Sequence, residues 1–228
     1  NDELISSDAI EGMVQESVSG GSAVKMEVID FLNDGAMPGA ASCLPVLAVR
    51  DDVIELSDTG VFLSGKLQTI LPAYETGGLL AVLGQLSGAA YALQNENAQV
   101  SLRIGDTKAK LIPDARQPWA LTVQISLEAD IVAYDIAGVY GKEEGLDNAA
   151  LSTALAQVVY SQAQAAVEQS LHRYGCDIFG FAARLCAGDA SLRGMLQEDP
   201  TATGDIEVRL DVQAQVNHVG GELTPFLS

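Results

Sequence analysis

One glycine-rich segment has the spacing of a nucleotide site. Gly60 to Lys66 (GVFLSGK) fits the first seven positions of a phosphate-binding loop. The eighth position is Leu67, which has no hydroxyl group for magnesium, and the residues between the glycines are typical of a strand. Pro72 also prevents a long helix from following directly. The segment therefore predicts a β-hairpin and not a nucleotide cofactor site.

The histidines offer one metal-like spacing. The chain contains His172 and His218, and His172 lies four residues before Cys176, as two metal ligands on one helix face would. Gly175 lies between them, and no second pair of ligands is near in the sequence. We therefore expect His172 to be a surface residue at a helix end, and we expect no metal site and no catalytic histidine.

Two of the pairs of adjacent carboxylates, Asp51-Asp52 and Glu143-Glu144, also invite a catalytic interpretation. Asp51-Asp52 predicts a turn, because adjacent strand residues point to opposite faces. Glu143-Glu144 precedes a helix, whose start favours negative charge. Nothing singles out an acid–base pair among the 31 acidic residues, so we expect no enzyme. The alternative is a hydrolase with a hidden carboxyl group of raised pKa in a cleft.

The charge and the cysteines limit the partners and the chemistry. The net charge is −19, and no basic stripe exists to neutralise phosphates, so we expect no nucleic acid partner and no electrostatic docking onto anionic lipid. The three cysteines (Cys43, Cys176 and Cys186) contain no C-x-x-C pair. Either all three are small buried hydrophobic residues or one pair is bridged.

We expect two domains, a smaller mixed α/β domain with a β-hairpin at 1–95 and a sheet-and-helix domain at 96–228. The predicted helices of the first are 7–18, 23–32 and 73–84, and its predicted strands are 44–49, 53–56, 60–63, 66–70 and 89–93. Residues 76–95 carry no charge, but their glycines and the lack of flanking Lys or Arg favour a buried helix and strand over a membrane span.

The second domain has the clearer pattern. The predicted strands are 100–104, 108–111, 119–130 and 206–216, and the predicted helices are 146–174, 177–186 and a short one near Leu192. Apolar and polar residues alternate along the two longest strands, so each has one buried and one wet face. The order β-β-β-α-α-β predicts an α+β fold, with an antiparallel sheet covered on one face by helices.

Four segments, in order, resemble the Ger(x)C family, the C subunits of nutrient germinant receptors of endospore-forming bacteria. DTGVFLSGKL at 58–67 looks like the family's G-T-A-V-F-K hairpin, and ETGGLLAVLG at 75–84 looks like its E-T-x-G-L helix. VSLRIGDTKAKLIP at 100–113 is similar to its strand pair ending in proline, and DIFGF at 177–181 is like its D-I-F-G-F segment. The residues that carry the likeness are Thr59, Gly60, Phe62, Glu75, Thr76, Gly77, Asp177, Phe179, Gly180 and Phe181.

The resemblance, over 44–219, implies a non-catalytic, extracytoplasmic lipoprotein domain that assembles with two membrane-embedded receptor subunits in nutrient-triggered germination. It implies a location on the outer face of the inner spore membrane, through a lipid anchor upstream of Asn1, with this chain as the soluble portion. Asp177 is expected to cap a helix, and Phe179 and Phe181 to pack. The family usually has Ala at the position of Gly60, and its long helix is richer in Lys and Glu.

The alternative function is an extracytoplasmic small-molecule-binding domain unrelated to germination. It predicts a deep apolar pocket with a few convergent polar groups between the two domains. The sequence leaves open which nutrient is sensed and whether this subunit contacts it.

Overall fold

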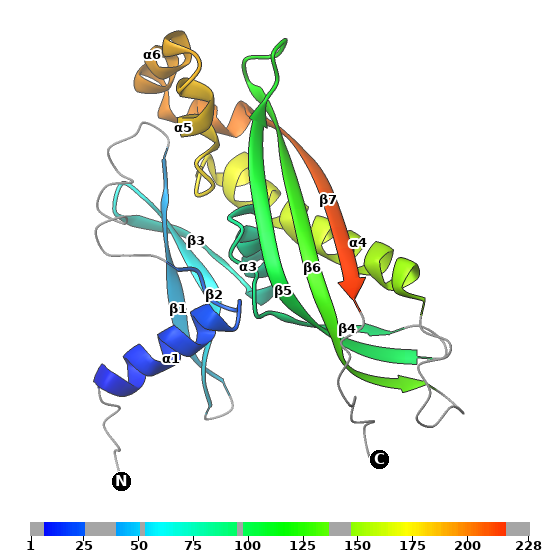
Figure 1. The fold of residues 1–228 in the computed structure, drawn as a ribbon. Helices are drawn as coiled ribbons and strands as arrows, with labels where there is room; N and C mark the ends of the chain where they lie inside the picture. Colours follow the sequence, from blue (N-terminus) through cyan, green and yellow to red (C-terminus); the bar gives the residue numbers. More distant parts are fainter. Residues whose placement is uncertain (1–6, 26–39, 51–52, 95–97, 137–146, 218–228) are drawn as a thin grey trace.

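The computed structural model describes residues 7–25, 40–50, 53–94, 98–136 and 147–217 (Figure 1). Its first part contains α1 (Ser7–Ser19), β1 (Ser42–Arg50), β2 (Val53–Leu63), β3 (Lys66–Leu71) and α3 (Ala73–Val82). The remaining elements are β4 (Ala90–Gln94), β5 (Ala98–Pro113), β6 (Ala120–Ile136), α4 (Asn148–Val167), η1 (Glu168–His172), α5 (Phe181–Cys186), α6 (Ala190–Glu198), η2 (Pro200–Asp205) and β7 (Glu207–Asn217). Most of the predicted helix at 23–32, the pairs Asp51-Asp52 and Glu143-Glu144, and His218 lie outside the described residues.

The first sheet is antiparallel, in the order β1-β2-β3. Ser64 and Gly65 have φ values of 51° and 72°, and Leu63 pairs directly with Lys66 on either side of them. Two consecutive positive φ values are the geometry of a tight hairpin turn, so the β-hairpin prediction is confirmed. The predicted strands at 53–56 and 60–63 form the single strand β2.

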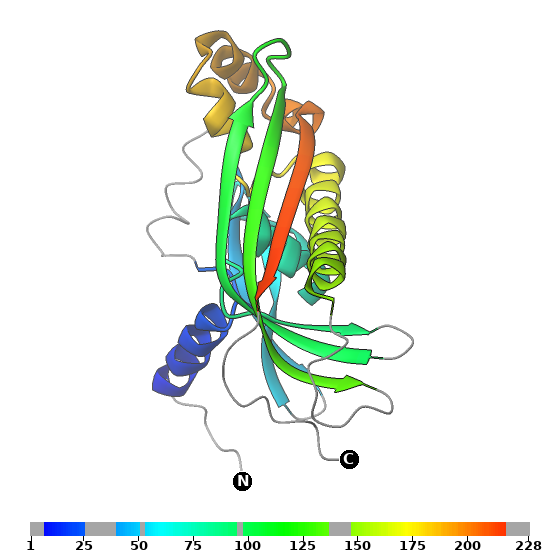
Figure 2. The ribbon, with the colours of Figure 1, turned by 45° about the vertical axis from the view of Figure 1, so that its right-hand side comes forward.

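The second sheet has the order β4-β5-β6-β7. The predicted strands at 100–104 and 108–111 are parts of one long strand, β5, with Gly105 as an extra residue between paired positions. Val132 is an extra residue in the same way in β6. Such bulges bend a sheet, and the ends of β5 and β6 beside β4 turn away from the rest of the sheet (Figure 2).

The α+β expectation is confirmed, but the second sheet is mixed and not wholly antiparallel. β7 pairs with β6 in parallel, beginning with Ala120 beside Glu207. After β6 the chain passes along α4 and through the shorter helices, which return it to the end of the sheet where β6 begins (Figure 1). A strand entered from that end has to run in the same direction as β6.

Helices α3 and α4 cover one side of the second sheet. Asp147 caps α4 by accepting hydrogen bonds from Ala149 N (2.9 Å) and Ala150 N (3.1 Å). α4 packs against α3 and β7, and α3 also contacts strands of both sheets, so one buried apolar core includes residues from each. β4 pairs with β5 across the proposed boundary at residue 95, and the division into domains at that residue stays a prediction.

Within the ranges that the structure describes, no helix is both long enough and apolar enough to cross a membrane.

Candidate functional site

The first two family-like segments meet through buried threonines. The Thr76 hydroxyl lies 3.0 Å from Leu71 O and 3.1 Å from the Thr59 hydroxyl, and both threonines are buried. These contacts fix the start of α3 against the β2–β3 hairpin. Glu75 lies in the first turn of α3, where a carboxylate favours the helix dipole. Thr59, Glu75 and Thr76 therefore have structural tasks.

The glycines of these segments allow close packing. A Cβ atom at Gly60 would lie 3.2 Å from the Phe62 ring and 3.3 Å from Leu67, so an alanine there requires both side chains to move slightly. A Cβ atom at Gly77 would lie 3.3 Å from the Gln162 side chain. At Gly78 it would overlap the Gln162 backbone, so α3 and α4 cross at this glycine pair.

The D-I-F-G-F segment is organised around a buried carboxylate. Asp177 Oδ1 accepts hydrogen bonds from Phe179 N and Phe181 N (both 3.1 Å), and its Oδ2 accepts one from Ala182 N (2.7 Å). Burial raises the pKa of Asp177, and these N–H groups oppose that rise. The Phe179 and Phe181 rings stack with centroids 4.8 Å apart.

One detail of this segment differs from the prediction. α5 begins at Phe181 and not at Asp177, because Gly180 has a φ of 76°, outside the helical region. Asp177 nevertheless satisfies N–H groups in the first turn of α5 from outside the helix, as an N-cap would. The expected cap and the expected packing of the two aromatic rings are therefore present, and the capping residue lies four positions before the first residue of α5.

The possible metal pair has other partners. His172 is exposed, and its Nδ1 lies 2.9 Å from Gly204 O. Cys176 is buried, and burial raises the pKa of its thiol to about 11. Cys43, Cys176 and Cys186 are all buried and none of them forms a disulfide bond, so the structure favours three small buried thiols over a bridged pair.

A small cavity lies where α1, α3 and β4 meet. Gly21, Gly77 and Gln162 are among its lining residues, and its volume is about 270 Å³. Beside it, Tyr91 Oη donates to Gln162 Oε1 (2.8 Å), and burial raises the pKa of Tyr91. Ligand pockets usually have volumes of about 300–1,000 Å³, so this cavity is smaller than the deep pocket that the small-molecule alternative predicts.

Two larger hollows, of about 320 and 410 Å³, lie end to end between α4 and β7 and share Tyr160. We name them together the α4–β7 groove. Its lining residues are Ser152, Thr153, Ala156, Gln157, Tyr160, Gln164, Val167, Glu168, His172, Val208, Arg209, Leu210, Val212, Gln213 and Ala214. The ten residues that carry the family likeness all lie elsewhere.

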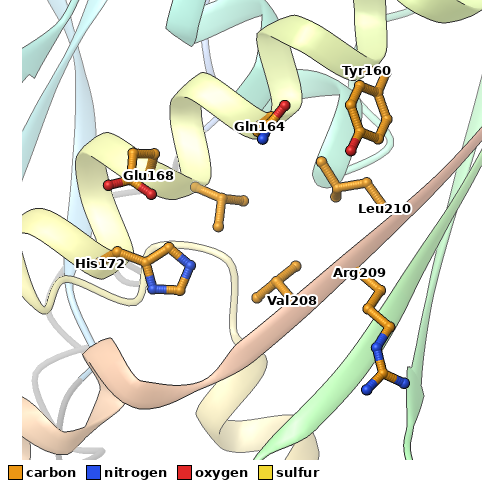
Figure 3. A pocket seen from close by; sticks show the side chains of 8 residues that line it. Tyr160, Gln164, Glu168, His172, Val208, Arg209 and Leu210 are labelled. Atoms are coloured by element: carbon orange, nitrogen blue, oxygen red, sulfur yellow. The ribbon is translucent and has the colours of Figure 1, made fainter.

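The two walls of the groove differ in chemistry. The helix wall is mostly polar, with Gln164 and Glu168 exposed, whereas Val208 and Leu210 on the strand wall are half-buried and apolar (Figure 3). Arg209 points away from the helix, where it forms ion pairs with Asp114 (3.0 Å) and Glu207 (2.7 Å). No catalytic constellation forms here, but an elongated surface lies beside a strand edge.

The sequence pattern does not reveal this groove. Its apolar wall follows the alternation that predicts core residues, and its polar wall resembles an ordinary solvated helix face. The one available signal is a second stripe at 153, 157, 160, 164 and 168, spaced by three and four residues, which runs along α4 into η1.

Comparison with known proteins now identifies the family. No curated protein matches this chain. The crystal structure of the GerBC protein has a similar fold, with a TM-score of 0.65 at 13% sequence identity, and the match covers 86% of this chain and 65% of that one. The domain family described as "Spore germination B3/ GerAC like, C-terminal" matches residues 57–220, well over half of the sequence. The resemblance to Ger(x)C proteins is thus confirmed, and this chain belongs to the spore germination B3/GerAC-like, C-terminal family.

Proposed function

We propose that the chain is a non-catalytic part of a spore germinant receptor subunit, which works by assembling with partner subunits in nutrient-triggered germination. The observation that carries this proposal is the family match over residues 57–220. The GerBC-like fold supports it, since the match extends over 86% of this chain.

The uses of the family-like residues are structural and argue against a catalytic role for them. Thr59 and Thr76 join two elements, Gly77 lies at a helix crossing, and Asp177 holds the start of α5. Asp177 has the raised pKa that the hydrolase alternative requires, but it lines none of the described hollows and its oxygens accept backbone N–H groups. This is the use of a carboxylate as a cap.

The proposed partners are two membrane-embedded receptor subunits, as the Ger(x)C resemblance implies. The proposed location is the outer face of the inner spore membrane, with attachment through a lipid anchor upstream of Asn1 in a longer protein. The acidic surface suits contact with protein partners that carry basic segments, because the net charge of −19 favours positively charged surfaces.

Gene deletion in the spore former that encodes this protein tests the role in germination. We expect the mutant spores to lose the response to at least one nutrient, and the full-length gene to restore it. Normal germination of the mutant with every nutrient would contradict the proposal.

Purification of the tagged, lipid-anchored protein from spore membranes tests the assembly. We expect two polytopic membrane proteins, encoded beside its gene, to copurify with it. Recovery of the tagged protein alone would refute the proposed assembly and leave the fold and family unchanged.

A further inference from the structure

The edge strand β7 directs unpaired backbone groups into the α4–β7 groove. Glu207 N donates to Trp119 O (2.7 Å), so the odd-numbered residues of β7 bond with β6. Successive residues of a strand direct their N–H and C=O groups to opposite edges. The even-numbered residues that line the groove therefore direct these groups away from β6. They are Val208, Leu210, Val212 and Ala214.

At one end of this edge, a backbone N–H group already has a hydrogen-bond acceptor. Val216 N donates to the Ser152 hydroxyl (3.0 Å), where the first turns of α4 lie across the strand. For the four even-numbered residues before Val216, the described part of the chain supplies no such partner. A row of unpaired donors and acceptors on a sheet edge is a template for another strand.

The dimensions of the groove suit an extended peptide. Its two hollows follow β7 from Val208 to Ala214, and a peptide strand rises about 3.3 Å per residue beside a strand of the same pitch. Alternate residues of such a peptide would bond with the even-numbered residues of β7. Its side chains would meet the apolar strand wall or the polar helix wall, which includes Gln157 and Gln164. A compact small molecule cannot use a row of backbone groups in this way.

The charges of the groove and of the whole chain favour a basic peptide. Glu168 is exposed on the helix wall, and no ion pair engages it among the described residues. Arg209 does not neutralise it, because Asp114 and Glu207 hold its guanidinium on the other side of the strand. The whole chain has a charge of −19, which repels a second copy and favours a segment rich in Lys or Arg.

We propose that the α4–β7 groove binds an extended basic segment of a partner protein, which pairs with β7 as an added strand. The inference rests on the proposed function in taking this segment from a receptor subunit. It adds the surface of contact, the backbone conformation of the partner and the sign of its charge.

Synthetic peptides provide the first test. Overlapping peptides that cover the extramembrane segments of the two membrane subunits would be titrated against the purified chain by fluorescence anisotropy. We expect one basic peptide to bind. N-methylation of every second residue should abolish binding when it blocks the N–H groups that face β7, and should leave binding intact when it blocks the N–H groups on the opposite edge of the peptide. This pattern is the signature of strand pairing, because only one edge of the peptide donates to β7.

Two alanines of α4 form a matched pair of variants. Ala156→Trp fills the groove, whereas Ala154→Trp places the same side chain on an exposed part of α4 that lines neither hollow. We expect Ala156→Trp to weaken binding by about tenfold or more, and Ala154→Trp by less than about twofold. In the same way, Glu168→Lys should weaken binding and Glu198→Lys on α6 should not, since Glu198 is exposed and lines neither hollow.

Amide hydrogen exchange measured by NMR locates the binding edge without any change to the protein. In the free chain, the amides of Leu210, Val212 and Ala214 should exchange much faster than those of the odd-numbered residues between them. The bound peptide should protect the even-numbered amides.

Three results would overturn the proposal. One is a peptide that binds and protects another surface, and another is protection of β7 that increases with chain concentration alone, which would indicate pairing of two copies. The third is copurification of the intact subunits with no peptide bound and no effect of Ala156→Trp, which would refute the groove interface and leave the proposed function standing. Failure of the subunits to copurify would instead contradict the proposed function.

Discussion

A single buried carboxylate organises the segment between α4 and α5. Asp177 is 2% exposed, and its two oxygens accept hydrogen bonds from three backbone N–H groups. Asp189 at the start of α6 is a more ordinary cap, because its oxygen accepts from Ser191 N (2.8 Å) near the surface. Asp177 and Asp189 therefore provide the same interaction, a carboxylate that accepts from backbone N–H groups, in a buried and in a partly exposed setting.

We expect Asp177→Ala to lower the free energy of unfolding by about 2–4 kcal/mol, because it leaves several buried N–H groups without acceptors. Asp189→Ala should cost about 1 kcal/mol, as loss of a surface N-cap usually does. Urea unfolding followed by circular dichroism measures both changes. Equal costs for the two variants would show that burial adds nothing to the importance of Asp177.

The cysteines give a second prediction for individual residues. All three thiols are buried, and the pKa of Cys176, raised to about 11, keeps that thiol protonated at neutral pH. Because the thiolate is the reactive form, we expect almost no reaction with a thiol reagent at pH of about 8 in the folded protein. The same reagent should label three thiols per chain in urea. Rapid labelling without urea would contradict this arrangement.

Among the elements, the crossing of α3 and α4 tolerates the least change. A Cβ atom at Gly78 would overlap the Gln162 carbonyl group and lie 2.7 Å from Ala163 N. We expect Gly78→Ala to destabilise the protein by about 3 kcal/mol or more, because the helices must separate. Gly194→Ala in α6 is the control, since no atom lies within 4 Å of its Cβ position, and it should stabilise by up to about 1 kcal/mol. Thermal unfolding measures both, and similar effects would exclude close packing as the cause.

The strands also show how much of the fold the sequence patterns predict. The alternation in 119–130 and 206–216 identified β6 and β7, but the same alternation fits parallel and antiparallel strands. The direction of β7 depends on where the chain returns to the sheet, which no local pattern records. In β5, the inward-facing residues have even numbers before Gly105 and odd numbers after it, and this change marks the bulge. The sequence-based prediction instead places a gap between two strands there.

The candidate site was less predictable than the fold. Its two walls come from α4 and β7, and most of its strand wall looks like ordinary core in the sequence. Val208 and Leu210 are only half-buried because α4 lies beside the edge strand and leaves a hollow there. Such a gap depends on the placement of a helix relative to a strand, and local periodicity contains no information on that distance.

For the whole molecule, the charge of −19 determines how a basic partner segment arrives. We expect the association rate constant of the bound peptide to fall by about tenfold or more between about 0.01 M and 0.5 M salt, because ions screen long-range attraction. The dissociation rate constant should change less, since backbone hydrogen bonds hold the bound strand. Stopped-flow measurements at several salt concentrations separate the two, and an association rate independent of salt would contradict electrostatic attraction.

The extra residues in β5 and β6 affect the curvature of the second sheet but not the composition of its core. On either side of Gly105, the buried residues Ile104 and Thr107 face the core, and a chain without Gly105 would still alternate correctly through Asp106. Val132 lies between the buried residues Ile131 and Tyr134 in the same way. Deletion of either residue would therefore straighten the sheet without turning any apolar side chain toward water. The curvature of this sheet and the composition of its core can thus change independently, one by insertion or deletion and the other by substitution.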